Sequence, residues 1–222
     1  MNFEESLRLS IALGLTIFLV LLRFDSERIM RSDYFRYRYP WMGPLSYYGL
    51  VIAFAIGIVL ILPSGRAQLF LTPGDPDTML PVMLLFSGVA ILNAIGYAFR
   101  WYGGITPLPT PLLASRLLGA AASAVADELQ FRSIVLGMLL FADIPGGVPA
   151  ALLIQALLYG LAQRRLWRER QWYFLVGSVL LGYGAGLATV TTGSVVPAMV
   201  GHFAVLAALF AFAGGRLRTR PI

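Results

Sequence analysis

Three ionisable side chains stand close together inside a long apolar run, and their types suit acid–base chemistry. The octet ADELQFRS, residues 126–133, contains Asp127, Glu128 and Arg132. Charged groups are costly in hydrocarbon, so an ionisable residue inside an apolar helix is a functional-site hypothesis by default. Carboxylates are also among the groups that move protons in catalysis. The octet is therefore the first candidate for a functional site.

The spacing of these residues predicts how they pair. Glu128 and Arg132 are four residues apart, which on a helix places them on one face in the favourable acid-first order. We expect an internal ion pair that lowers the cost of burying both groups, and a polar clamp between helices is the alternative role. Asp127 points about 100° away and needs a partner from another helix or from water. The only histidine, His202, and Gln163 lie on later apolar runs that could converge on it.

The composition indicates a membrane environment for these groups. The chain has 222 residues, of which 58% are hydrophobic and 13% charged, and its mean hydropathy is +0.76. A water-soluble globule cannot hide that much apolar surface. We therefore predict an all-α integral membrane protein with a single domain over residues 1–222, because the length leaves no room for a second soluble domain. Cysteine is absent, which excludes disulfides and thiolate zinc sites.

Seven apolar runs must position the candidate groups, and we expect each run to be a transmembrane helix. They cover residues 7–22, 45–62, 79–99, 111–141, 148–163, 172–190 and 194–213. The fourth run holds both acids about 15 residues from each end, which places them near the middle of the membrane. We expect residues 1–110 to form peripheral helices with an aromatic and basic cytoplasmic loop, and residues 111–213 to form the core.

The arginines predict the orientation of the bundle. All 17 basic residues are arginines, and thirteen of them lie in the connectors 23–44, 99–110 and 164–171 and in the tail from Arg216. The alternate segments hold only Arg8 and Arg66. This positive-inside pattern predicts an N-terminus outside and a C-terminus in the cytoplasm, in a prokaryotic-type inner or plasma membrane. Nucleic-acid binding is not expected, because no basic soluble face is available to carry it.

Two connectors have compositions of their own. RSDYFRYRYPWMGP, residues 31–44, interleaves arginine with aromatic residues, which predicts an anchor in the headgroup region; a docking surface for a partner is the alternative. PSGRAQLFLTPGDPD, residues 63–77, is rich in turn formers and predicts a short outer loop.

Three segments carry a family resemblance: ADELQFRSIVLG (126–137), YGLAQ (159–163) and TGSVVPAMVGHF (192–203). In this order they resemble the motifs EExxxR, FxxxH and HxxxN of the CPBP family, the CAAX-prenyl protease and bacteriocin-processing family of intramembrane proteases. The resemblance spans residues 112–210. Glu128, Arg132 and His202 match the pattern, whereas Asp127 replaces the first glutamate, Gln163 the second-motif histidine and Leu206 the third-motif asparagine.

The resemblance implies glutamic-type hydrolysis of a peptide bond by an activated water. It assigns Asp127 as the general base, Glu128 and Arg132 as a supporting pair, and His202 as a donor to the oxyanion. Gln163 can orient a water but cannot take its proton. No cofactor is expected, and one histidine with two acids falls below the usual ligand complement of a zinc site.

Three functions remain open from the sequence. The first is an intramembrane endopeptidase that cuts a peptide or the tail of a membrane protein. The second is an inactive pseudoprotease that serves as a binding scaffold or as a subunit of a larger membrane complex, because losing one oxyanion donor or one acid–base partner typically costs about 10²-fold or more in rate. The third is a small transporter or proton relay, in which the buried acids carry ions.

Overall fold

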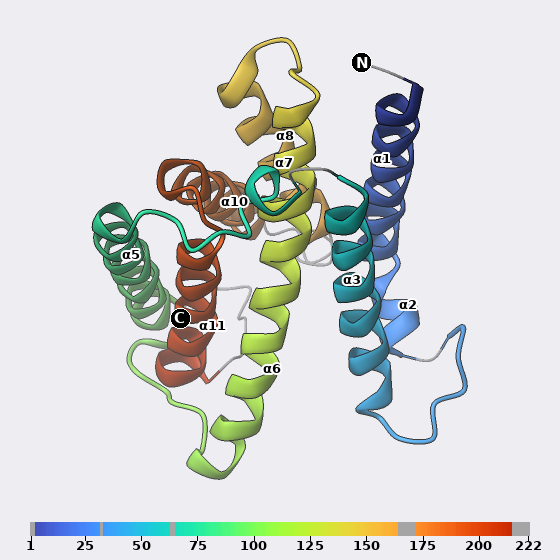
Figure 1. The fold of residues 1–222 in the computed structure, drawn as a ribbon. Helices are drawn as coiled ribbons and strands as arrows, with labels where there is room; N and C mark the ends of the chain where they lie inside the picture. Colours follow the sequence, from blue (N-terminus) through green and yellow to red (C-terminus); the bar gives the residue numbers. More distant parts are fainter. Residues whose placement is uncertain (1–2, 32, 63–64, 164–171, 215–222) are drawn as a thin grey trace.

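The computed structural model describes residues 3–31, 33–62, 65–163 and 172–214. Within these ranges the regular structure is helical apart from one isolated bridge, between Leu71 and Ser194. In chain order (Figure 1) the elements are α1 (Phe3–Phe24), α2 (Ser26–Met30), α3 (Met42–Ile61), α4 (Gly65–Gln68), α5 (Pro76–Tyr102), α6 (Thr110–Glu128), the π-helix η1 (Leu129–Val135), α7 (Leu136–Phe141), α8 (Gly147–Ala162), α10 (Trp172–Thr192) and α11 (Val196–Ala213). The predicted all-α class is confirmed.

Every apolar run that the sequence singles out lies on a helix. The fourth run is one continuous helical rod, because α6, η1 and α7 follow each other without a break from Thr110 to Phe141. Helix α8 is apolar but shorter than a typical span. Five helices in the described part of the chain are long and apolar enough to cross a membrane: Phe3–Phe24, Met42–Ile61, Pro76–Arg100, Leu175–Thr192 and Val196–Ala213. The count of seven spans and the orientation of the termini stay predictions.

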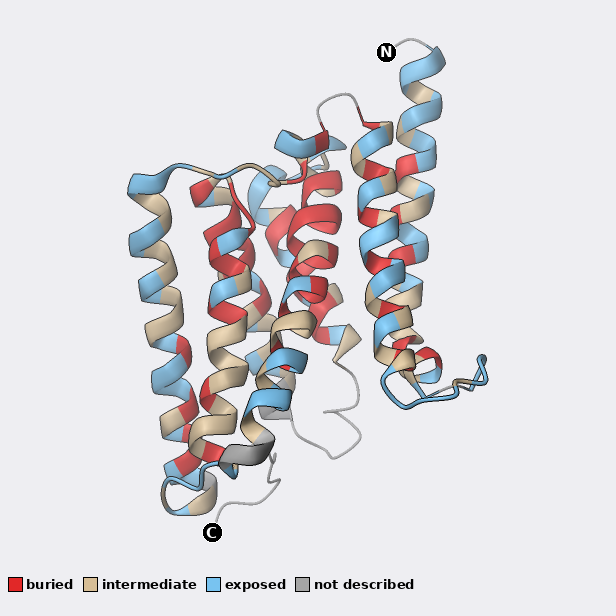
Figure 2. Ribbon diagram, turned by 60° about the horizontal axis from the view of Figure 1, so that its bottom comes forward, coloured by how far each residue is buried: buried red, intermediate tan, exposed pale blue. Residues whose placement is uncertain are grey.

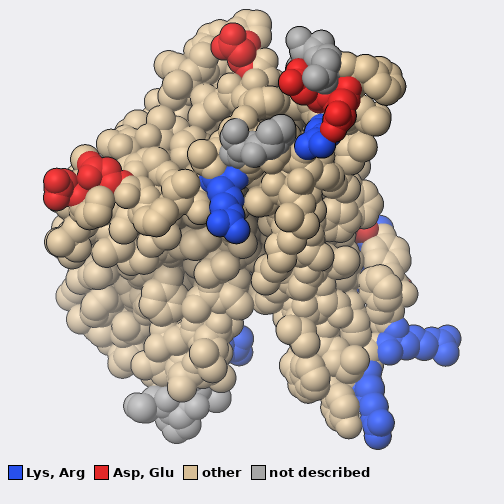
Figure 3. Space-filling model, in the orientation of Figure 1, with Lys and Arg blue, Asp and Glu red and all other residues tan. Residues whose placement is uncertain are grey.

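Large apolar side chains cover the outside of the bundle. Leu60, Leu85, Leu92 and Leu118 are each at least 69% exposed within the isolated chain. Figure 3 shows that the lateral surface on one face carries few charged side chains. Apolar surface of this extent marks contact with lipid or with another protein. Together with the long apolar helices, it identifies an integral membrane protein.

The rod of α6, η1 and α7 forms the centre of the bundle. Its π-helical part contacts α1, α3, α8 and α10, while α11 packs against α5, α6 and α10. Six of the seven residues of η1 are buried, and Figure 2 shows the buried residues concentrated in the middle of the bundle. Polar groups placed on this rod are therefore enclosed by helices from both halves of the chain.

The change from α-helix to π-helix occurs directly after the two acids. Glu128 is the last residue of α6, and Arg132 lies within η1. A π-helical turn closes with i→i+5 hydrogen bonds, and such turns are rare and frequently lie at functional sites. The sequence does not indicate this change. The segment is buried on all sides, so no exposed polar face reveals its helical period.

The predicted outer loop, residues 63–77, does more than connect two helices. In its described part, the carbonyl oxygen of Phe70 accepts a hydrogen bond from the amide of Val195 (3.0 Å). The hydroxyl of Ser133 donates to the carbonyl oxygen of Leu69. The loop thus joins η1 to the start of α11, and so helps to fix the helix that carries His202 relative to the rod.

Helix α11 also approaches α5 closely, at the glycine next to His202. A Cβ atom on Gly201 would lie 2.0 Å from Cδ1 of Phe86. We expect Gly201→Ala to destabilise the protein by about 1–3 kcal/mol, since the phenyl ring must move. The control is Gly88→Ala in α5, where nothing lies within 4 Å; it should stabilise by about 0.5–1 kcal/mol. Denaturant unfolding in detergent micelles measures both, and equal effects would contradict the prediction.

Candidate active site

The ion pair expected between Glu128 and Arg132 is present and completely buried. Nε of Arg132 lies 3.0 Å from Oε2 of Glu128, and neither side chain is exposed. The guanidinium also lies over the ring of Tyr159, with Cζ 4.1 Å from the ring centroid. Removing two charges from water is expensive, and the ion pair and the cation–π contact together offset part of that cost.

The second oxygen of Glu128 binds the imidazole of His202, which comes from α11. Nδ1 of His202 lies 2.7 Å from Oε1 of Glu128, and both residues are buried. An ionised carboxylate only accepts hydrogen bonds, so it favours the proton on Nδ1, and a neutral ring in this tautomer has Nε2 as an acceptor. A carboxylate that holds an imidazole in this tautomer orients it as a general base.

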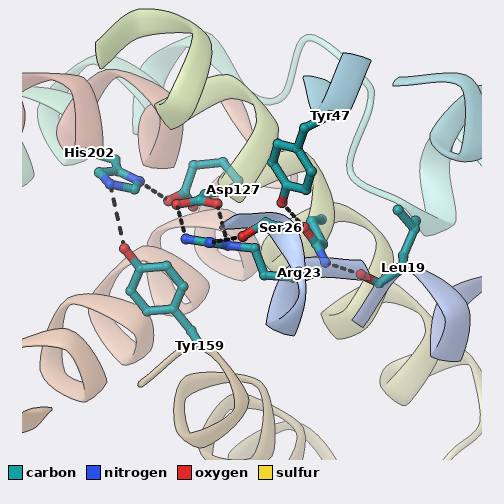
Figure 4. Close-up of polar contacts among 9 residues, drawn as sticks. Leu19, Arg23, Ser26, Tyr47, Asp127, Tyr159 and His202 are labelled. Atoms are coloured by element: carbon teal, nitrogen blue, oxygen red, sulfur yellow. Dashed lines mark hydrogen bonds and ion pairs between the residues drawn. The ribbon is translucent and has the colours of Figure 1, made fainter. Parts of the chain in front are cut away.

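Tyr159 faces the other side of the same imidazole. Its hydroxyl lies 3.5 Å from Nε2 of His202, at the limit of a hydrogen bond, and the two rings meet edge to face with centroids 6.1 Å apart. Figure 4 shows Tyr159 and His202 facing each other from separate helices. Residues from η1, α6, α8 and α11 therefore form one continuous polar group, which consists of Arg132, Glu128, Tyr159 and His202.

The partner of Asp127 comes from the other end of the sequence. Arg23, at the end of α1, places Nε 3.0 Å from Oδ1 and Nη2 3.4 Å from Oδ2 of this carboxylate. Both side chains are largely buried, with exposed fractions of 13% and 6%. The guanidinium is held in turn by the hydroxyl of Ser26, 3.1 Å from Nη1. Figure 4 shows Arg23 and Asp127 close to His202.

Gln163 does not join the buried group. It caps the C-terminal end of α8, and among the described residues its side chain makes no hydrogen bond to Asp127. It lines a cavity of about 330 Å³ instead. The other lining residues are Arg23, Phe24, Asp25, Ser26, Glu27, Arg28, Arg31, Asp33 and Ala162. Leu206 lies on α11, where it offers no hydrogen-bond donor.

Sequence reasoning missed two members of the site. Arg23 counts in the sequence as one of the connector arginines, and no local spacing links it to a residue 104 positions away. Tyr159 stands at the first position of YGLAQ, where the motif has phenylalanine. Its extra hydroxyl is the feature of the sequence that could have indicated a role in the site. Within the described residues, no group of three or more His, Cys, Asp or Glu side chains could hold a metal ion.

Comparison with known proteins bears on the central rod and the helices after it. Residues 109–208 match the family model described as type II CAAX prenyl endopeptidase, Rce1-like. Neither the curated proteins nor the solved structures gave a match. The matched range contains both acids, Tyr159 and His202, whereas Arg23 lies outside it. The resemblance inferred from the three motifs is thereby confirmed for residues 109–208, which we call the Rce1-like segment.

Proposed function

We propose that the protein is an intramembrane endopeptidase of the CPBP type, which hydrolyses a peptide bond with a water activated in the buried polar group. The contact of 2.7 Å between Glu128 and His202 carries this proposal. It joins an acid and an imidazole from two helices of the Rce1-like segment, in surroundings that exclude bulk water. A buried ionisable group of this kind marks a functional site in membrane proteins.

The geometry favours His202 as the base. With Glu128 on Nδ1, Nε2 can take a proton from a water that attacks the scissile carbonyl carbon. The imidazolium then returns this proton to the leaving amine as the C–N bond breaks. The hydroxyl of Tyr159, beside Nε2, can donate a hydrogen bond to the oxyanion. This assignment differs from the one that the family motifs imply, because both oxygens of Asp127 are engaged by Arg23.

The experiment uses purified protein in liposomes and two synthetic peptides. They share one sequence, with a cysteine near the C-terminus that is prenylated in the first peptide and unmodified in the second. We expect cleavage of at least one peptide in H₂¹⁸O to leave a single ¹⁸O in the new carboxyl group. His202→Gln should abolish that product. Intact peptides after incubation with folded wild-type protein would overturn the proposal.

A binding scaffold is the second candidate function, and the surroundings of Asp127 favour it. Asp127 is held by Arg23, and the second-motif position Gln163 lines a cavity with Arg23 but makes no hydrogen bond to Asp127 among the described residues. A scaffold needs the helices to stay together but does not need the imidazole. It should therefore keep its function in vivo through His202→Gln, provided that the variant accumulates to the wild-type level, whereas an enzyme should lose it.

Restoring the family residues tests whether His202 or Asp127 works as the base. We expect Gln163→His to change the cleavage rate by less than about tenfold, because this position lies on the cavity wall. A general base typically contributes about 10²–10⁴-fold to the rate. Leu206→Asn is the comparison: it adds a donor on α11, one turn from His202, and should raise the rate. Initial rates with the same peptides decide. A rise of about 10²-fold in the cleavage rate of Gln163→His would show that Asp127, and not His202, is the base.

A further inference from the structure

We propose that Arg23, which lies outside the Rce1-like segment, is a positioning residue that determines which of the two adjacent carboxylates holds the imidazole. This inference rests on the proposed function. By binding Asp127, Arg23 leaves Glu128 as the partner of His202. Helix α1 is therefore part of the active site, and the site is incomplete without it.

The four carboxylate oxygens show how the partners are divided. Oδ1 and Oδ2 of Asp127 face Nε and Nη2 of Arg23 at 3.0 and 3.4 Å. Oε1 and Oε2 of Glu128 face Nδ1 of His202 and Nε of Arg132 at 2.7 and 3.0 Å. Each oxygen thus has one nitrogen partner. Two neighbouring carboxylates without Arg23 would compete for the remaining cation and the imidazole, and Asp127 would be left as a buried charge without a counter-ion.

Helix α1 is docked firmly enough to hold Arg23 in place. One turn before Arg23, the carbonyl oxygen of Leu19 accepts a hydrogen bond of 2.6 Å from Nε2 of Gln130 in η1. The amide oxygen of Gln130 accepts another from the hydroxyl of Tyr47 in α3 (3.2 Å). In Figure 4, Leu19 and Tyr47 lie on one side of Asp127, and His202 lies on the other. The two hydrogen bonds tie α1 and α3 to the π-helical turn that carries Arg132.

The chemistry at this position suits arginine better than lysine. The planar guanidinium presents several N–H groups in a fixed fork, so it can engage both oxygens of one carboxylate and also the hydroxyl of Ser26. An ammonium group supplies a single point of charge. Arg23→Lys should therefore keep the charge balance but lose part of the orientation.

Kinetics of the full-length protein in liposomes, with the peptide that the wild type cleaves, test the role. We expect Arg23→Gln to lower kcat by about 10²-fold, the cost of a small misplacement of catalytic groups, with KM nearly unchanged. Arg23→Lys should fall between wild type and Arg23→Gln. Arg8→Gln, on the same helix in an exposed pair with Glu4, is the matched control and should keep wild-type kinetics.

A second variant separates positioning from a merely structural role. In Arg23→Gln/Asp127→Asn the neutral amide no longer competes with Glu128, so kcat should recover relative to Arg23→Gln alone. A double variant as slow as, or slower than, the single variant would overturn the proposal. So would an Arg23→Gln variant with wild-type kcat.

The single histidine gives a readout that does not depend on cleavage. In protein labelled with ¹⁵N-histidine, all imidazole signals come from His202. We expect the Nδ1 signal to shift in Arg23→Gln and to return toward the wild-type position in the double variant. Unchanged signals would overturn the role of Arg23 even in an active enzyme. If the Nδ1 signal shifts in Arg23→Gln but the wild-type protein cleaves neither peptide, the proposed function is overturned instead. The inference that Arg23 determines which carboxylate holds His202 would then still be supported.

Discussion

Replacing Glu128 with glutamine is expected to lower kcat for peptide cleavage by about 10²–10⁴-fold, with little change in KM. The amide has nearly the same shape, and its oxygen can still accept a hydrogen bond from Nδ1 of His202. It lacks the charge that stabilises the imidazolium formed when Nε2 takes a proton, and its NH₂ group permits the wrong tautomer of the ring. Initial rates in liposomes, normalised to folded protein, measure the effect.

The control is a glutamate that lies far from the buried group. Glu4→Gln, in an exposed pair with Arg8, should leave the rate unchanged. Asp127→Asn gives the contrast within the site, because Asp127 has no direct contact with the imidazole among the described interactions. If Asp127→Asn abolishes cleavage while Glu128→Gln retains it, the base is the first acid, and the assignment implied by the family motifs is the correct one.

The helices could be predicted because lipid leaves the backbone few alternatives. In a bilayer every backbone polar group must be satisfied within the protein, so an apolar run of about 20 residues becomes a helix. All seven apolar runs lie on helices for this reason. The pair of Glu128 and Arg132 could be predicted as well, because it depends only on a spacing of four residues along one helix.

The remaining contacts of the site depend on how distant helices pack. Arg23 meets Asp127 only because α1 lies against η1, and nothing in the residues near Arg23 encodes that placement. The position of Gln163 could not be predicted from the sequence either. Its place in YGLAQ indicates a family position, but α8 ends at Ala162, and Gln163 lines a cavity with Arg23 instead of meeting Asp127. A motif specifies residue order, whereas the packing of helix ends determines which side chains meet.

Replacing Arg132 with methionine is expected to destabilise the protein by about 3–5 kcal/mol, the typical cost of breaking a buried ion pair from one side. Arg132 is fully buried, and methionine retains much of its apolar volume. The change leaves the carboxylate of Glu128 in the bundle with only the imidazole as a partner, and it removes the cation over the ring of Tyr159. Denaturant unfolding in detergent micelles measures the loss.

A double variant also removes the charge of Glu128, which Arg132→Met leaves without its ion-pair partner. Arg132→Met/Glu128→Leu should recover the stability lost in the single variant, because well-packed apolar residues often replace a buried ion pair at no cost. A double variant as unstable as Arg132→Met would show that packing of the long side chain, and not its charge, holds the rod. The restored double variant also separates the two candidate functions. A scaffold that needs only the fold should work in it, whereas an endopeptidase should remain inactive, because the carboxylate that orients His202 is gone.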